Sequence, residues 1–98
     1  MSRVYTIPEL KNILTPIFQQ NGVRRAILFG SYANGHATPQ SDVDLLVDSG
    51  LRGLAFFGLL EDVVTALDMP VDLLDVSQIS ADSRISREIR ESGVEIFG

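Results

Sequence analysis

Two carboxylates separated by one residue are the part of the sequence best suited to chemistry. Asp42 and Asp44 flank a valine and precede the apolar run Leu45–Val47. Alternate residues of a β-strand point to the same face, so both carboxylates would project from one side of a strand. Neighbouring carboxylates repel each other unless a cation lies between them, and their hard oxygen atoms suit magnesium. The pattern predicts a divalent-metal site where a strand begins.

A polar loop entering a strand is the competing interpretation, with Ser41 and Asp42 as ordinary turn residues. It accounts for Asp42 but not for Asp44, because a carboxylate inside an apolar strand needs a partner. We therefore keep both aspartates as candidate catalytic residues and metal ligands.

Gly30-Ser31 is the second candidate element, at the end of the apolar run 26–29. A strand that ends in Gly-Ser and turns into a helix presents free backbone N–H groups and a hydroxyl, which favour phosphate. The dipeptide alone is equally typical of an ordinary strand-to-helix turn, so the prediction depends on the carboxylates that follow. A phosphate cradle beside an acidic pair indicates chemistry on a nucleotide.

The first helix is predicted over residues 7–20. Thr6 can cap it, and Glu9 stands three residues after the cap, as in a capping box. Pro16 lies inside the pattern and should kink or split the helix, and Asn21-Gly22 should end it. Its apolar residues recur at helical spacing and form one buried stripe: Ile7, Leu10, Ile13, Leu14, Ile17 and Phe18.

The cradle and the carboxylates come together in only one arrangement of strands. A first strand is predicted over 24–29, ending at Gly30, and a second over 43–47, beginning at the carboxylates. The two elements meet only if these strands run antiparallel. A helix over 51–67 then leads to a third strand over 71–76. A helical crossover makes the second and third strands parallel, with a right-handed connection.

Parallel pairing brings a third carboxylate to the same edge of the sheet. Asp72 opens the third strand as Asp42 and Asp44 open the second, so all three can gather there. Asp75 is the competing candidate, but it lies three residues further along and would point to the opposite face. The sequence therefore predicts Asp72 as the third member of the site.

The C-terminal part is predicted to hold one more helix and an edge strand. Ser77 or Ser80 would open the helix, which continues to Ser92-Gly93, and residues 94–97 alternate as a strand does. The whole pattern is typical of an α/β (α+β) class, a small mixed β-sheet flanked by helices. Arg84 with Glu88, and Arg87 with Glu91, are interpreted as four-apart pairs on a solvated face. The arginines Arg84, Arg87 and Arg90 are thus expected to be salt-bridged surface.

The middle helix contains an unbroken apolar run, residues 54–60. This run gives more apolar surface than a helix needs to pack on one face of a sheet. Phe56 and Leu59 fall beside the predicted sheet-facing set. We predict that they contact a second protein, either a partner or another copy of this chain through residues 54–67. Burial beneath the last helix is the alternative. The predicted sheet-facing set is Leu54, Phe57, Leu60, Val64 and Leu67.

Composition bounds the possible classes of protein. The 98 residues, 45% of them hydrophobic, suit one domain over residues 1–98. The absence of cysteine is compatible with a reducing cytoplasm, and neither a signal peptide nor a membrane span is visible. The net charge of −5, without a lysine or arginine cluster, argues against direct DNA or RNA binding. We expect a cytoplasmic protein that uses a nucleotide.

Taken together, the motifs resemble the signature of the minimal nucleotidyltransferases, small members of the DNA polymerase β-like superfamily. That signature is Gly-Ser, a short helical turn with a second glycine, a polar loop, and Asp-x-Asp opening a strand. Asn34 departs from it, since the family usually has arginine there. The resemblance implies the family's fold and a third acidic residue on the next strand, which is Asp72. The matching positions are Gly30, Ser31, Gly35, Ser41, Asp42 and Asp44.

The resemblance also implies an activity, magnesium-dependent transfer of a nucleotidyl group, with AMP passing from ATP to a protein hydroxyl. Asp42, Asp44 and Asp72 would bind two magnesium ions, and Asp72 would also accept the proton of the attacking hydroxyl. Gly30 and Ser31 would bind the β- and γ-phosphates. Stand-alone domains of this size are commonly antitoxins encoded beside a HEPN-domain toxin, so the resemblance implies such a partner.

Other interpretations stay open. One alternative is a nucleotide-binding protein that lost turnover with Asn34 and neutralises its partner by contact. A second is a transferase that acts on a small molecule or an RNA end. A third is a plain acidic α/β domain whose motif is fortuitous. His36, the single histidine, lies in a predicted loop without a neighbouring base, and we assign it no role.

Overall fold

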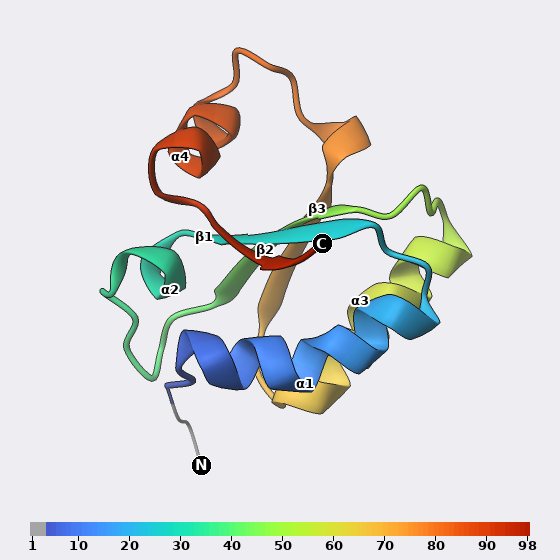
Figure 1. The fold of residues 1–98 in the computed structure, drawn as a ribbon, viewed down its shortest axis with the longest axis horizontal. Helices are drawn as coiled ribbons and strands as arrows, with labels where there is room; N and C mark the ends of the chain where they lie inside the picture. Colours follow the sequence, from blue (N-terminus) through green and yellow to red (C-terminus); the bar gives the residue numbers. More distant parts are fainter. Residues whose placement is uncertain (1–3) are drawn as a thin grey trace.

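The computed structural model describes residues 4–98 as a mixed α/β fold built on a four-stranded sheet (Figure 1). The predicted fold class is confirmed. No helix in this part of the chain is long and apolar enough to cross a membrane. In chain order the elements are α1 (Ile7–Gln20), β1 (Arg25–Phe29), α2 (Ser31–Asn34), β2 (Val43–Asp48), α3 (Leu54–Leu67), β3 (Val71–Asp75), the 3₁₀ helix η1 (Val76–Gln78), α4 (Arg84–Ser92) and β4 (Val94–Phe97).

The sheet has the strand order β3-β2-β1-β4. Strands β1 and β2 are antiparallel, as the meeting of cradle and carboxylates requires. Strands β2 and β3 are parallel and are joined by α3, so the predicted crossover is confirmed. The predicted edge strand is also present, since β4 pairs with β1. This order places β2, which carries the acidic pair, between two neighbours.

Helix α1 begins as predicted and continues past its internal proline. Thr6 and Glu9 form the capping box, with the Thr6 hydroxyl accepting from the Glu9 N–H at 3.1 Å. Pro16 does not split the helix, which remains one element to Gln20. The proline is exposed, so the carbonyl that loses its hydrogen bond can be solvated. The capped start and the buried stripe hold the helix together on both sides of the proline.

The core lies between the sheet and the helices α1 and α3. Figure 1 shows both helices on one side of the sheet and α4 on the other side. Alternate residues of β1 and β2 point to the α1–α3 side, because the side-chain period of a strand is two. The largest fully buried side chains are Phe18, Leu10, Leu14, Leu28, Leu45, Leu59, Leu67, Val43, Val47 and Val63.

The predicted orientation of α3 was wrong. Leu59 is fully buried and belongs to the core, whereas Leu54 and Phe57 are 89% and 53% exposed. Phe56 is half-buried and packs against the core. The whole helix is apolar enough to offer two overlapping stripes, and packing against α1 selects the stripe that contains Leu59. Leu59 therefore cannot contact a second protein, and self-association through residues 54–67 stays a prediction.

The start of the last helix also differs from the prediction. Ser83, rather than Ser77 or Ser80, caps α4 by accepting from the Ser86 N–H at 3.1 Å. Ser77 lies instead in η1, the short 3₁₀ turn whose cap is Asp75. Two serine-rich turns follow β3, and sequence spacing does not distinguish which of them caps the longer helix. The loop between η1 and α4 joins the end of β3 to the helix on the second side of the sheet (Figure 1).

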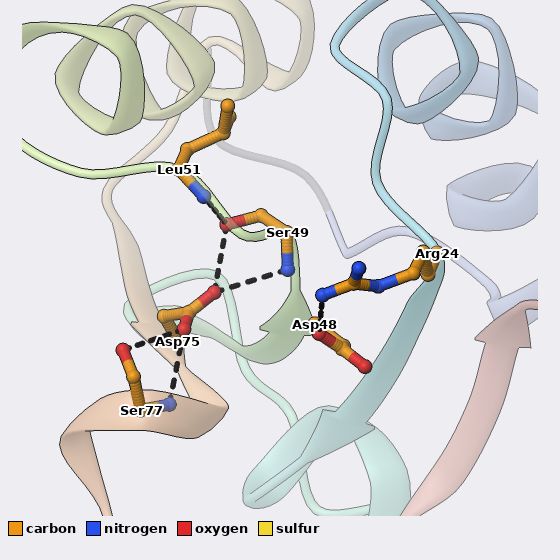
Figure 2. Close-up of polar contacts among 6 residues, drawn as sticks. All are labelled: Arg24, Asp48, Ser49, Leu51, Asp75 and Ser77. Atoms are coloured by element: carbon orange, nitrogen blue, oxygen red, sulfur yellow. Dashed lines mark hydrogen bonds and ion pairs between the residues drawn. The ribbon is translucent and has the colours of Figure 1, made fainter.

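Asp75 joins the ends of β2 and β3 through a set of short hydrogen bonds (Figure 2). Its Oδ1 accepts from the Ser49 N–H and hydroxyl at 3.0 and 2.7 Å. Its Oδ2 accepts from the Ser77 N–H and hydroxyl at the same two distances, 3.0 and 2.7 Å. Burial by itself raises the pKa of Asp75, but these bonds outweigh it and lower the pKa to about 2. The junction is therefore built for the charged carboxylate.

Acid should weaken this junction. The native pKa of Asp75 lies below that of the unfolded chain, so the stabilisation is complete above about pH 5 and is lost as the pH falls towards 2. It amounts to about 2 kcal/mol. We expect Asp75→Asn to lower the free energy of unfolding at neutral pH by about this amount and to flatten its dependence on acid. Urea denaturation across this pH range would measure both effects.

Asp82→Asn is the matched control, because Asp82 is an exposed loop carboxylate. It should keep the acid dependence of the wild type. An Asp75→Asn protein whose stability falls with acid as steeply as the wild type would contradict the role given to this junction.

The orientation of α3 gives a second test. Leu59→Ala should cost about 2–5 kcal/mol, because it opens a cavity in a fully packed core. Leu54→Ala should change the stability by less than about 0.5 kcal/mol, since Leu54 is 89% exposed. Thermal or urea denaturation of the two variants measures the difference. Equal losses of stability would show that α3 buries a different face.

Candidate active site

The backbone of Gly30 lies directly against the carboxylate of Asp44. Phe29, the last residue of β1, pairs with Asp44 in the antiparallel ladder, so Gly30 follows at the same level. A Cβ built on residue 30 would overlap Oδ2 of Asp44. Gly30 also has φ +74°, which side chains other than hydrogen rarely tolerate. Both observations restrict position 30 to glycine and place the cradle beside the acidic pair.

The parallel ladder sets Asp72 beside Asp44. The two residues are register partners across β2 and β3, so their side chains leave the same face of the sheet. Asp42 precedes β2 by one residue and is exposed, as Asp72 is. The predicted gathering of three carboxylates at this edge is therefore present in the backbone. Asp75 points to the opposite side and is buried, as the spacing predicted.

Asp44 carries an unbalanced charge. Its pKa is raised to about 6, first by burial and then by the charges of Asp72, Asp42 and Glu88. A group held this way is stabilised by any cation that enters among the carboxylates, because the cation offsets both the burial and the repulsion. The local electrostatics thus favour a bound metal or another positive group.

The three aspartates suit magnesium as a donor set, although their side chains do not form a closed cage. Within residues 4–98, no three acidic or histidine side chains are already arranged to hold an ion. Asp42 and Asp72 are exposed and free to turn. Magnesium keeps several of its waters and is commonly bound through one or two carboxylates and substrate phosphates, so an open edge fits it.

The cradle itself is a tight turn that opens α2. The Gly30 carbonyl accepts from the N–H groups of Ala33 and Asn34 at 3.1 and 3.2 Å, which closes the first turn. The Ser31 hydroxyl makes no hydrogen bond within the described part of the chain. Its position after Gly30 leaves it available to a ligand beyond the end of β1. A phosphate oxygen is one acceptor that this hydroxyl and the neighbouring N–H groups can bind.

Asn34 and His36 belong to the turn that leaves α2. The Asn34 side chain accepts from the His36 N–H at 3.1 Å, and the Ser31 carbonyl accepts from the same N–H at 3.0 Å. Asn34 is exposed and serves this local turn. The cradle therefore contains no arginine at the position where the resemblance leads one to expect it.

Glu88 is the site neighbour that sequence reasoning missed. It was interpreted as the partner of Arg84 on a solvated face, but its charge contributes to the raised pKa of Asp44. Its place beside Ile85 and Ile89 on α4 was a usable signal, since these half-buried residues face the sheet. The strand that α4 covers could not be inferred, because the loop before it forms no regular element.

The comparisons with known proteins point to one family. Residues 12–98 match the model of the polymerase beta nucleotidyltransferase family. A protein adenylyltransferase MntA of Thermococcus cleftensis is 38% identical over 82 residues, which cover 78% of this chain and 83% of that protein. A protein of the same name in Shewanella oneidensis is 33% identical over 73 residues, covering 72% of this chain and 51% of that protein.

A solved structure gives the same result. The crystal structure of a toxin–antitoxin with AMP-PNP contains a chain that superposes with a TM-score of 0.77 and 27% identity. The match covers 90% of the present chain and 73% of that chain. The strand registers pair Phe29, the residue before Gly30, with Asp44, and Asp44 with Asp72. The chain belongs to the polymerase beta nucleotidyltransferase family.

Proposed function

We propose that this protein is a magnesium-dependent adenylyltransferase that transfers AMP from ATP to a hydroxyl group of a protein partner. The observation that carries the proposal is the contact of the Gly30 backbone with Asp44, which is itself in register with Asp72. A phosphate group bound at Gly30-Ser31 would lie next to the carboxylates. Nucleotide and metal would therefore share one edge of the sheet.

The reaction is a displacement at the α-phosphorus of the nucleotide. The oxygen of the acceptor hydroxyl forms a bond to the α-phosphorus, and the bond from this phosphorus to the bridging oxygen of the β-phosphate breaks. Pyrophosphate leaves with that electron pair, and the proton of the hydroxyl passes to the carboxylate of Asp72. Gly30 and Ser31 hold the β- and γ-phosphates so that the leaving group is aligned.

Magnesium would be held by Asp42, Asp44 and Asp72, and we propose that two ions bind there. Bound magnesium offsets the phosphate charge and lowers the pKa of the attacking hydroxyl. The three carboxylates are suited to this task because hard oxygen donors match magnesium. The repulsion that raises the pKa of Asp44 would be relieved by the same binding.

The biological role that we propose is that of an antitoxin acting on a HEPN-domain toxin. The support is that relatives carry the name protein adenylyltransferase MntA. A solved structure at 27% identity is a toxin–antitoxin with AMP-PNP. The acceptor would then be a hydroxyl side chain of the toxin.

Neutralisation by contact alone is the second candidate, and one observation favours it. Asn34 is occupied in a local turn and brings no positive charge to the cradle. Transfer would be slow if no other cation assisted the phosphates. The two candidates differ in whether label from ATP appears on the partner.

Binding of ATP should depend on a divalent ion. We expect calorimetry to detect ATP binding with magnesium and almost none with a chelator, because three carboxylates without a cation repel the phosphates. Asp44→Asn should weaken the metal-dependent part. Equal binding in both conditions would remove the metal site from the proposal.

Transfer should require the acidic pair. With labelled ATP and the partner toxin, the wild type should label the toxin, and Asp44→Asn should lower the rate by at least about a hundredfold. Asp82→Asn removes an exposed carboxylate that is not among the charges acting on Asp44, and it should keep the wild-type rate. A wild type that silences the toxin without labelling it would establish the contact-only candidate.

A further inference from the structure

Asp42 is the predicted metal ligand that lies outside the regular structure. Asp44 and Asp72 belong to β2 and β3 and are register partners, so the sheet fixes their backbones. Asp42 precedes β2 by one residue and is exposed, and its side chain makes no hydrogen bond or ion pair within residues 4–98. The position of its carboxylate therefore depends on the loop that leads into the strand.

Asp42 is also repelled by its neighbours. Its charge acts on Asp44, as the charge of Asp72 does, and like charges in a partly buried place favour separation. A loose loop would let Asp42 move away until a cation arrived. Ordering the loop at that moment would cost conformational entropy and would weaken the binding of the ion.

The end of this loop is closed by reciprocal hydrogen bonds between Thr38 and Ser41. The Ser41 hydroxyl accepts from the Thr38 N–H at 2.9 Å, and the Thr38 carbonyl accepts from the Ser41 N–H at 2.9 Å. The Thr38 hydroxyl accepts from the Gln40 N–H at 3.3 Å and lies 3.4 Å from the Ser41 hydroxyl. Residues 38–41 therefore form a closed turn directly before Asp42.

Both flanks of the turn are attached to the rest of the fold. On the N-terminal side, Ala37 packs against the hydrophobic core. On the other side, Val43 is fully buried, and its N–H donates to the Pro70 carbonyl at 3.2 Å. The backbone of Asp42 is thus held from both directions, whereas its side chain stays exposed and open to a ligand.

The Ser41 hydroxyl is the side-chain group on which the turn depends most. Ser41 is half-buried, and its hydroxyl makes the shortest side-chain hydrogen bond of the turn. The side chains of His36 and Gln40 are exposed and make no hydrogen bond in the part of the chain that the structure describes. Without the Ser41 hydroxyl, the Thr38 N–H would lose its partner, and the turn would lose one of its two reciprocal bonds.

We propose that Ser41 is a positioning residue of the site, whose hydroxyl fixes the loop so that Asp42 is held beside Asp44 before the metal ion binds. The proposal rests on the nucleotide function proposed above. Ser41 would contact neither the ion nor the nucleotide and would act through the backbone of Asp42. A ligand that is already in place need not be ordered when the ion arrives, which favours tighter binding.

A positioning role predicts a changed requirement for magnesium. Ser41→Ala should raise the magnesium concentration for half-maximal binding of AMP-PNP by about two- to tenfold, the range for one neutral hydrogen bond. At saturating magnesium, the affinity for AMP-PNP should return to within about twofold of the wild type, because the ion then draws the loop into place. Calorimetry with AMP-PNP over a series of magnesium concentrations measures both quantities.

Two further variants control the experiment. Ser41→Thr keeps the hydroxyl and should keep the magnesium requirement of the wild type. Ser80→Ala should keep it as well, because the Ser80 side chain is exposed and makes no hydrogen bond among the described residues.

Amide hydrogen exchange without any ligand gives a second readout. The N–H of residue 41 should exchange several-fold faster in Ser41→Ala than in the wild type, because its bond to the Thr38 carbonyl opens more often. The N–H of Leu45, a fully buried residue of β2, should exchange at the wild-type rate and show that the sheet is retained. Equal exchange at residue 41 in both proteins would contradict the role of Ser41.

The outcomes of calorimetry separate the two proposals. Absence of AMP-PNP binding to the wild type would overturn the nucleotide function and the role of Ser41 with it. An unchanged magnesium requirement in Ser41→Ala would overturn only the role of Ser41. The same conclusion would follow if saturating magnesium did not restore the affinity of Ser41→Ala, since the defect would then lie at the phosphates.

Discussion

The close approach of the Gly30 backbone to the Asp44 carboxylate is the constraint on which the candidate site depends. It requires a residue without a side chain at the end of β1, a positive φ at that residue, and the antiparallel register that pairs Phe29 with Asp44. A shift of one residue in that register would turn Asp44 to the other face of the sheet. The packing of Leu28 and Leu45 on the α1–α3 side prevents such a shift, because both are fully buried. The core therefore holds the site in place.

Two carboxylates of the same sheet lie in opposite electrostatic environments. Asp75, at the end of β3, accepts four hydrogen bonds from two serines, so the fold stabilises its charge. Asp44, near the start of β2, is partly buried among other acidic groups and has a raised pKa. The first arrangement contributes to stability, and the second leaves a charge that a ligand can satisfy. Such unsatisfied charge is typical of functional sites, because binding then supplies what folding does not.

The two sides of the sheet differ in the residues that cover them. Helices α1 and α3 cover one side and pack against the strands to form the apolar core (Figure 1). Helix α4 covers the other side with a narrow stripe, and its flanks carry Glu88 and Arg84. The sheet thus separates the residues that hold the fold from those of the proposed nucleotide site.

The sequence by itself determined the order of the elements and the antiparallel and parallel pairings of the strands. It also determined that Asp42, Asp44 and Asp72 gather beside Gly30. These features follow from local periodicity and from the rule for crossover connections. Tertiary structure decided which stripe of α3 is buried, since residues 54–67 are apolar on more than one face and only packing against α1 selects between them. It also decided that Ser83 caps α4, and that the charge of Glu88 acts on Asp44. These features depend on where the irregular loop before α4 places that helix over the sheet, and no local pattern in the sequence encodes this position.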